Sequence, residues 1–534
     1  MSQGALPDLR DRLMLAFVGM TLPAETERRL REAPAAGITL FRYHNVESPG
    51  QLRELTDAAQ RAAADGGRAG PLLVSGDQEG GQLVALGDGS TPFPGNMALG
   101  ATGDPTLAER VGMAIGTEAM AMGVNVVYAP CCDLATNPAN PHLGIRAFGD
   151  DAASVGRFTA AMVRGIQASG AAATLKHFPG LGEADLDTHH GLPNLDHDRA
   201  RLDGVELVPF VAGIDAGAEL VMSAHIALSG LTGLADLPAT LARGIMTDLV
   251  RDGLGFRGLT ITDALDMEAL PQGDAQAIDA VAAIRAGVDL LLCVHDETKA
   301  ARIEGAITHA AARGLFDAAE LWASAERLAT LRARLATTPR PELDAVGGAA
   351  HRVLAREVAD RSITLVRNRD GRLPLRLAPG DSILAVMPRP RNLTPADTSK
   401  SVQPGLASAL RRHWPEVREI VTSHPPTPAE IAAVVEASAQ ATLTVVGTIS
   451  ASADPSPAAL VDALLLAGRS LVTVALRTPW DLTAYPGAGT HVVAYGILEP
   501  TLAALAATLF GELPFRGRLP VALPPGLQED GDAR

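Results

Sequence analysis

Residues 176–193, KHFPGLGEADLDTHHGLP, carry several side chains that could take part in proton transfer. Asp187 and His189 are two positions apart, and such residues face the same way in an extended segment. A carboxylate beside an imidazole fixes the ring's tautomer and favours its protonated form, as a general acid requires. An isolated Asp-x-His is more often a hydrogen-bonded loop pair, but the companions described below favour the catalytic interpretation.

A second carboxylate, Asp263, follows the apolar run LTIT. We expect it at the C-terminal end of a strand, where a carboxylate can attack an anomeric carbon and form a glycosyl-enzyme ester. The alternative is a helix N-cap, a common place for aspartate. Asp266, three residues later, fits that capping role better, so we interpret Asp263 as the nucleophile.

Other polar residues also follow apolar runs, and each has a structural alternative. Asp77 and Glu79 in SGDQEGG could grip sugar hydroxyls or belong to an ordinary turn. Arg146 could clamp a substrate or simply pair with an acid. His225 could line a pocket or only satisfy backbone groups. None of these residues indicates a binding site by itself, and we treat them as candidates because they occur together.

The elements that position these residues are eight short apolar runs, each followed by a loop and an Ala-rich helical pattern. They begin at Leu13, Gly37, Pro71, Val124, Ala171, Ala218, Gly258 and Val288. Nearly continuous hydrophobicity is expected of a strand buried on both faces. Asp104 and Asp151 stand where N-caps of the intervening helices would be. Eight strand–helix alternations predict an α/β fold with a closed (β/α)8 barrel rather than an open doubly wound sheet.

The positions of the polar residues agree with a barrel. All strand C-termini of a barrel converge on one face around one cavity, whereas an open sheet would spread them along an edge. A shared polar pocket accounts for charged residues that a packed core would not tolerate. The residues in question are Asp77, Asp133, Lys176, His177, His225 and Asp263.

The chain is predicted to contain two domains, because 534 residues exceed a single ordinary core. The barrel is assigned to residues 1–335, and a Pro- and Gly-punctuated linker to residues 336–350. Residues 351–534 contain six further strand candidates with helical patterns between them, which predicts a smaller α/β sandwich.

Composition narrows the possible partners and the compartment. A net charge of −16 disfavours nucleic acid and anionic membrane surfaces. The start of the chain lacks the pattern of a signal peptide, and no apolar run is long enough to span a bilayer. Three sparse cysteines fit a reducing compartment, and His189-His190 lacks the spacing of a metal site. We therefore expect a cytoplasmic protein without a metal or cofactor, and assign no oligomeric state.

Together these motifs resemble glycoside hydrolase family 3, in its β-N-acetylglucosaminidase branch. The matching segments, in family order, are GDQEGG, NVVYAPCCDLATNPANPHLGIRAFGDD, KHFPGLGEADLDTHHGLP, VMSAH and GFRGLTITDALDM. The segments ADRSITLVRN and GRLPVALP are similar to the α/β sandwich that follows the barrel in two-domain members.

The resemblance implies a role for each matched residue. Asp263 stands at the nucleophile position, His189 at the acid/base position on a mobile loop, and Asp187 at its dyad partner's position. The sugar-binding positions are occupied by Asp77, Arg146, Lys176 and His177. Family β-glucosidases generally use a glutamate and lack the Asp-x-His element, so the resemblance implies N-acetylhexosamine substrates.

The chain departs from the family pattern at three positions. Ala85 stands where an arginine sugar ligand is frequent, and Gln82 stands where the nearer arginine of the pattern is found. Leu181 replaces a frequent histidine in the PGHG segment. These changes leave the proposed catalytic residues in place but bear on which sugar and leaving group are accepted.

We therefore expect a retaining β-N-acetylhexosaminidase whose partner is a small carbohydrate, such as an N-acetylglucosaminide, a muropeptide or a chitin fragment. An N-acetylglucosaminide phosphorylase would use the same residues but transfer the sugar to phosphate. A β-glucosidase would prefer the glucoside. A sugar-binding protein without turnover would need neither nucleophile nor dyad at these spacings.

Overall fold

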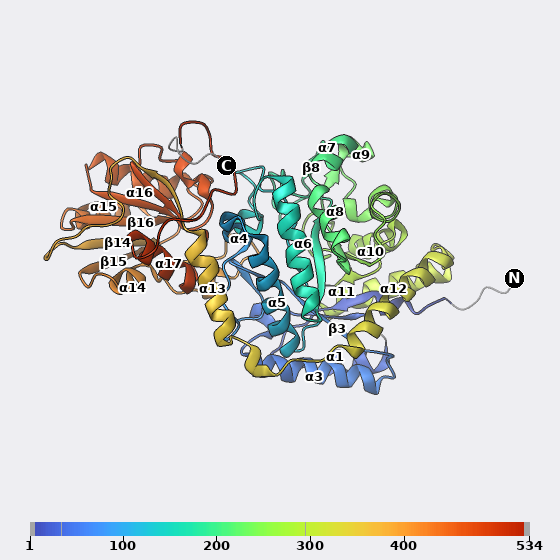
Figure 1. Ribbon diagram of the computed structural model, residues 1–534. Helices are drawn as coiled ribbons and strands as arrows, with labels where there is room; N and C mark the ends of the chain where they lie inside the picture. The colour runs from blue at the N-terminus through green and yellow to red at the C-terminus, as the bar shows by residue number, and fades with distance from the viewer. Residues whose placement is uncertain (1–5, 34, 294, 528–534) are drawn as a thin grey trace.

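The computed structural model describes residues 6–33, 35–293 and 295–527. An N-terminal barrel, blue to green in Figure 1, lies beside a smaller C-terminal domain in orange and red. Helix α13 (Ala349–Ser362) stands between the two and contacts α4 (Asn96–Thr102), α5 (Pro105–Ala121) and α17 (Glu499–Leu509). The predicted barrel followed by a smaller α/β domain is confirmed.

The barrel has eight parallel strands, one from each apolar run. They are β1 (Leu13–Leu15), β2 (Gly37–Thr39), β3 (Leu73–Gly76), β6 (Val126–Val127), β7 (Ala172–Phe178), β9 (Leu220–Ser223), β11 (Leu259–Thr262) and β12 (Leu291–Leu292). Their order is β11-β9-β7-β6-β3-β2-β1-β12. A parallel bridge between Ile261 and Leu290 joins the two ends of this order and closes the barrel.

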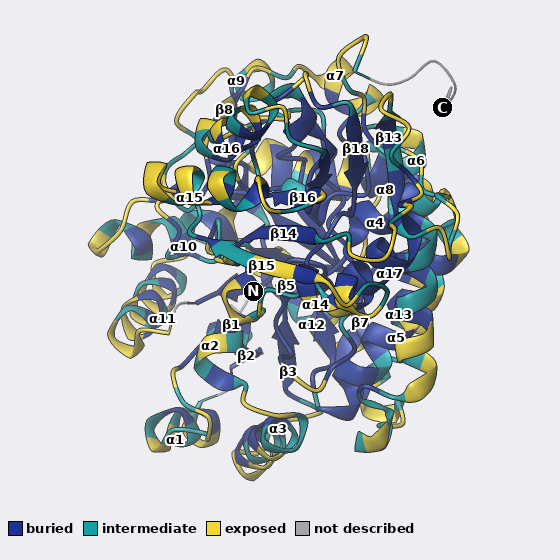
Figure 2. Cartoon of the chain, turned by 90° about the vertical axis from the view of Figure 1, so that its left-hand side faces the viewer, coloured by how far each residue is buried: buried dark blue, intermediate teal, exposed yellow. Residues whose placement is uncertain are grey.

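A main helical segment follows each strand and packs on the outside of the barrel. These segments are α1 (Ala24–Glu32), α3 (Pro49–Asp65), α5 (Pro105–Ala121), α6 (Ala152–Ala168), α8 (Val208–Asp215), the π-helical segment η4 (Gly244–Gly253), α10 (Asp274–Ala286) and α11 (Glu297–Ala312). Asp104 and Asp151 cap α5 and α6, as predicted. Figure 2 shows buried strands inside and exposed outer faces on α1, α3 and α11. Among the described residues, no helix is both long and apolar enough to cross a membrane.

The barrel interior is apolar, and α12 (Ala318–Thr337) covers its N-terminal end. Interior side chains such as Met14, Leu73 and Val126 form one buried cluster with Leu328, Leu331 and Leu335 of this helix. Each of these three leucines contributes roughly 2 kcal/mol by leaving water. The cluster therefore closes the interior of the barrel beneath α12.

A buried carboxylate, Asp289, stands at the N-terminal end of the barrel and is 1% exposed. Its oxygens lie 2.5 Å from Arg251 Nη2 and 2.6 Å from Arg327 Nη2. Burial alone would raise the pKa of Asp289, but the charges of the two arginines outweigh it and lower the pKa. These ion pairs therefore help to stabilise the barrel. They lie at the opposite end of the strands from the polar C-terminal face.

We expect Asp289→Asn to destabilise the barrel by about 3 kcal/mol at pH 7, because it leaves two arginines without their anion. The native carboxyl has a lowered pKa, so its stabilisation is complete above the unfolded-state value of about 4 and is lost below it. The difference in the free energy of unfolding between wild type and variant should therefore become smaller as the pH falls below about 4. Denaturant unfolding at several pH values measures this, with the exposed Asp65→Asn as control. A difference that is constant with pH would contradict the ion-pair explanation.

The second domain contains a six-stranded sheet with helices on both faces. Its strands are β13 (Thr364–Asn368), β14 (Ile383–Pro388), β15 (Val417–Thr422), β16 (Leu443–Thr448), β17 (Leu471–Ala475) and β18 (Thr490–Val493), in the order β13-β18-β17-β16-β14-β15. Only β13 runs antiparallel. The helices are α14 (Leu406–Arg411), α15 (Pro428–Ser438), α16 (Pro455–Leu466) and α17 (Glu499–Leu509). One core cluster includes α15 and α16 and the other α14 and α17, so the sheet is covered on both sides.

Candidate active site

A cavity of about 400 Å³ opens at the C-terminal ends of the barrel strands. Asp77 follows β3, His177 lies in β7, and Asp263 follows β11, so three separate strands deliver polar side chains to one space. His189 and Arg146 line the same cavity from loops. Of the six strand-end residues that the sequence predicted to share one pocket, Asp77, His177 and Asp263 line this cavity.

Asp263 lies at the end of β11 and faces the cavity. Its Oδ1 atom accepts a hydrogen bond of 2.8 Å from the amide of Ala264. Burial would raise the pKa of Asp263, but the charges of His177 and His225 and the Ala264 amide together lower it. Asp263 is therefore ionised at neutral pH, the state in which a carboxylate can act as a nucleophile.

The loop carrying Asp187 and His189 places the two side chains as a pair. Asp187 Oδ1 lies 2.7 Å from His189 Nδ1 and accepts a second bond of 2.9 Å from the His189 amide. Asp187 is buried, whereas the His189 side chain is 22% exposed and lines the cavity. The ring nitrogen that does not face Asp187, Nε2, is thus the one available for a substrate.

Backbone contacts hold this loop against its neighbours. The carbonyl of Thr188 accepts from the amide of Ala269, 3.0 Å away, in the loop that follows the nucleophile. Gly182 lies so close to the carbonyl of Leu134 that a Cβ atom would come within 2.0 Å of it, and Gly180 has a φ of 118°. Both positions need glycine, as the tight loop read from the sequence requires.

A network of buried charges lies beside the cavity. Arg146 forms a bidentate pair with Glu79, with both N···O distances 2.9 Å. Lys176 Nζ lies 2.5 Å from both Asp77 Oδ1 and Glu79 Oε1. Burial would raise the pKa of Glu79, but the charges of Arg146 and Lys176 hold it well below its usual range. The network therefore holds these side chains in fixed positions, as recognition of sugar hydroxyls requires.

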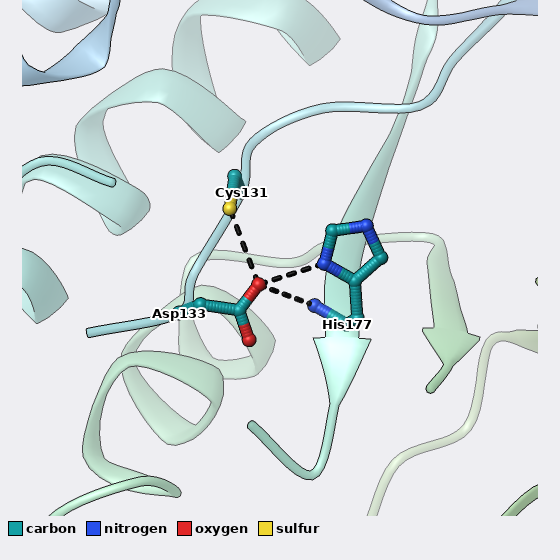
Figure 3. Close-up of side chains that lie close together, drawn as sticks. All are labelled: Cys131, Asp133 and His177. Carbon is teal, nitrogen blue, oxygen red and sulfur yellow. Dashed lines mark hydrogen bonds and ion pairs between the residues drawn. The ribbon is translucent and has the colours of Figure 1, made fainter. Parts of the chain in front are cut away.

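Asp133 forms hydrogen bonds with His177, as Figure 3 shows. His177 Nδ1 lies 2.7 Å from Asp133 Oδ2, and the Cys131 thiol donates to the same oxygen at 3.2 Å. The second oxygen of Asp133 accepts from the amide of Leu181 at the start of the dyad loop. Asp133 was identified from the sequence only as a strand-end acid, and its links to both elements depend on tertiary contacts.

Within the described part of the chain, two groups of side chains have ligand atoms close enough to hold a metal ion. One is Cys131, Asp133 and His177, and the other is His142, Asp187 and His189; within each group the ligand atoms lie within 4.8 Å of one another. Burial raises the pKa of the Cys131 thiol well above its ordinary value, so the sulfur remains protonated and donates to Asp133. Hydrogen bonding therefore accounts for the first group, and the second contains the candidate acid/base.

The second domain supplies part of the cavity wall through residues 395–398. Thr398 donates its amide to the carbonyl of Gln82 at 2.8 Å, and its Oγ1 accepts from the amide of Val84. Asp397 is fully buried and lies 2.8 Å from Arg477 Nη2. The wall is thus fixed to both domains, and no sequence pattern had indicated it.

Two sequence interpretations change with the structure. Asp266 does not cap a helix, because the next helix, α10, begins at Asp274; its side chain lines the cavity instead. His225 is fully buried next to the end of β11, where Nδ1 contacts Thr240 Oγ1 and Nε2 contacts the carbonyl of Ala264. His225 is absent from the cavity lining, so its position matches the backbone-satisfying alternative.

The three departures from the resemblance have distinct surroundings. Ala85 lines the cavity, and Arg42 donates to the carbonyl of the preceding Val84, so a different arginine lies at this wall. Gln82 is buried at the contact with the second domain. Leu181 is buried and uses only its backbone to bond Asp133 and Asn140.

A model of the glycosyl hydrolase family 3 N-terminal domain matches residues 11–331. The chain belongs to glycosyl hydrolase family 3. The family match covers the barrel, including every catalytic and sugar-binding candidate predicted from the sequence.

Relatives of this family 3 chain include two curated enzymes. β-Hexosaminidase A of Pseudoalteromonas piscicida is 34% identical over 380 residues, covering 67% of this chain and 63% of that protein. The chain thus spans less than two thirds of that relative's length. β-Hexosaminidase of Stenotrophomonas maltophilia strain K279a is 36% identical over 291 residues, covering 53% of this chain and 84% of that protein.

One solved structure resembles this family 3 chain along nearly its whole length. It is a glycoside hydrolase family 3 β-N-acetylglucosaminidase from Paenibacillus sp. str. FPU-7, with a TM-score of 0.91 and 33% sequence identity. The alignment covers 97% of this chain and 99% of that one. The likeness therefore includes the second domain as well as the barrel.

Proposed function

We propose that this chain is a retaining β-N-acetylhexosaminidase that releases terminal non-reducing β-linked N-acetylglucosamine. The observation that carries the proposal is the placement of Asp263 and the Asp187–His189 pair on one cavity of a family 3 barrel. The relatives named as β-hexosaminidases and the structure named as a β-N-acetylglucosaminidase support the choice of substrate.

In the first step, the ionised Asp263 carboxylate attacks the anomeric carbon while the bond to the leaving oxygen breaks. His189 donates the Nε2 proton to that oxygen, and Asp187 stabilises the imidazole through Nδ1. The lowered pKa of Asp263 supports its role, because a protonated carboxyl could not attack. The product of this step is a covalent glycosyl ester on Asp263.

In the second step, His189 removes a proton from water, which attacks the anomeric carbon and releases Asp263. Two inversions leave the sugar with its original β configuration. Histidine replaces the carboxylic acid of the common two-carboxylate scheme. The adjacent Asp187 supports this replacement, because it compensates the positive charge that forms on the ring.

We assign sugar binding to Asp77, Arg146, Lys176 and His177. Asp77, Arg146 and His177 line the cavity, and Lys176 lies just behind Asp77 with its ammonium group paired to it. Charged groups held in fixed positions can bond several sugar hydroxyls without reorganising. The position of His225 behind Ala264 favours support of the nucleophile's backbone over sugar contact.

The decisive experiment is a panel of nitrophenyl β-glycosides, assayed with and without inorganic phosphate. We expect turnover of the N-acetylglucosaminide, free N-acetylglucosamine as product and little turnover of the glucoside. Formation of N-acetylglucosamine 1-phosphate would instead identify a phosphorylase, and preference for the glucoside a β-glucosidase. Tight binding without any product would exclude an enzyme.

We further propose a cytoplasmic location and a role in recycling cell wall fragments. All three cysteines are free and buried, which is compatible with a reducing compartment. Fractionation of cells of the source organism, followed by an N-acetylglucosaminidase assay of each fraction, tests the location. Activity confined to the medium or to an extracytoplasmic fraction would contradict it.

A further inference from the structure

His142 lies in the loop that leads to the short 3-10 helix η2 (Gly144–Arg146), and sequence reasoning assigned it no role. The residue is 3% exposed yet lines the cavity. Its Nε2 atom is 2.7 Å from Arg146 Nη1, and its Nδ1 atom is 3.2 Å from Asp187 Oδ1. His142 therefore stands between the arginine of the charge network and the carboxylate of the dyad.

The neighbours of His142 determine which ring nitrogen carries the proton. A guanidinium group only donates hydrogen bonds, so Nε2 must be the acceptor and the proton resides on Nδ1. Burial, followed by the charge of Arg146, lowers the pKa of His142 to about 4, so the ring is neutral at working pH. Among the described residues, the Nδ1 atom has no fully aligned hydrogen-bond partner, and the acceptor that it faces is Asp187 Oδ1, 3.2 Å away.

Asp187 in turn is surrounded by donors that fix its charge. Burial would raise the pKa of Asp187, but the two histidines and the His189 amide lower it far below its usual value. The rings of His142 and His189 also pack against each other, with centroids 5.3 Å apart and planes inclined by 33°. His142 thus contacts both members of the dyad, through a polar edge and through a ring face.

We propose that His142 is a positioning residue that holds Asp187 in line with His189 and connects this dyad to the Glu79–Arg146 ion pair. The inference rests on the proposed function, because positioning matters only if His189 transfers protons. It follows that His142 helps to position both Arg146, which binds the sugar, and His189, which acts on that sugar. His142 touches no reacting atom in this scheme and acts through Asp187.

His142→Ala should lower kcat on the nitrophenyl N-acetylglucosaminide on the order of 10-fold to 100-fold, with KM changed less than about threefold. A residue that served only sugar binding would raise KM and spare kcat. Wild-type kcat in a folded His142→Ala variant would overturn the proposal.

Two conservative variants test the roles of the two ring nitrogens of His142 separately. Asparagine places its amide near the position of Nδ1 and can still donate to Asp187, whereas glutamine reaches the position of Nε2 and can still accept from Arg146. We expect His142→Asn to recover most of the lost kcat and His142→Gln to recover little. The reverse order would show that His142 acts through Arg146 and would overturn its assigned link to the dyad.

A double-mutant cycle keeps the test valid even if one variant is less stable. In an Asp187→Ala background, His142→Ala should cost less than about twofold in kcat, because the group that it positions is already missing. Fully multiplicative losses would contradict the proposal. Failure of the wild-type enzyme to release N-acetylglucosamine would refute the proposed function itself, whereas wild-type activity with unaffected His142 variants would refute only this inference.

Discussion

Asp263→Asn should lower kcat on the nitrophenyl N-acetylglucosaminide on the order of 10⁴-fold or more, because the amide cannot form the glycosyl ester. The side chains have nearly the same shape, and the Oδ1 atom can still accept from the Ala264 amide. We therefore expect the fold to be unchanged by circular dichroism and the melting temperature to remain close to that of the wild type.

The matched control is Asp274→Asn, the same substitution on the exposed first turn of α10. It should leave turnover at the wild-type level. Turnover of the Asp263 variant within a few-fold of wild type would remove Asp263 from the mechanism. A large loss accompanied by a lower melting temperature would point to damage of the barrel instead, since Asp263 lies at the end of a core strand.

His189→Ala should reduce kcat on the order of 10²-fold to 10⁴-fold for poor leaving groups, because the group that we propose to protonate the departing oxygen is then missing. The loss in kcat/KM should be much smaller for a dinitrophenyl glycoside, whose leaving group departs without a proton. Steady-state kinetics with a series of aryl leaving groups measures this difference. An equal loss for all leaving groups would contradict a general acid.

The neighbouring histidine provides a control for this experiment. His190 is exposed and is absent from the cavity lining. His190→Ala should therefore retain wild-type kinetics with every leaving group. A leaving-group effect in the His190 variant, rather than in the His189 variant, would reassign the acid/base by one position along the loop.

The barrel could be predicted from the sequence because its strands have a local signature. Each run, such as the one at Gly258, is nearly continuous in hydrophobicity, since a barrel strand contacts helices on one side and the interior on the other. Asp263 was identified because it interrupts such a run at its end. The dyad was found because Asp187 and His189 are two residues apart, so no long-range contact was needed to bring them together.

Other features depend on contacts that no local pattern records. Thr398 contacts Gln82 from the other domain. His142 contacts Asp187 although α6 and β7 lie between them in the chain. Asp266 was assigned to a helix cap on spacing alone, but the chain continues in turns and the helix begins at Asp274. The role of such residues is set by packing between elements, which a single sequence does not specify.

Because residues 395–398 line the cavity, its wall is built by both domains of the chain. Asp263, which we propose as the nucleophile, belongs to the barrel, whereas part of the surface that a bound ligand would meet belongs to the second domain. Under the proposed function, we expect exchanges in residues 395–398 to change the preferred aglycone while Asp263 and His189 keep their places. Selectivity can therefore be engineered more than a hundred positions downstream of the nucleophile.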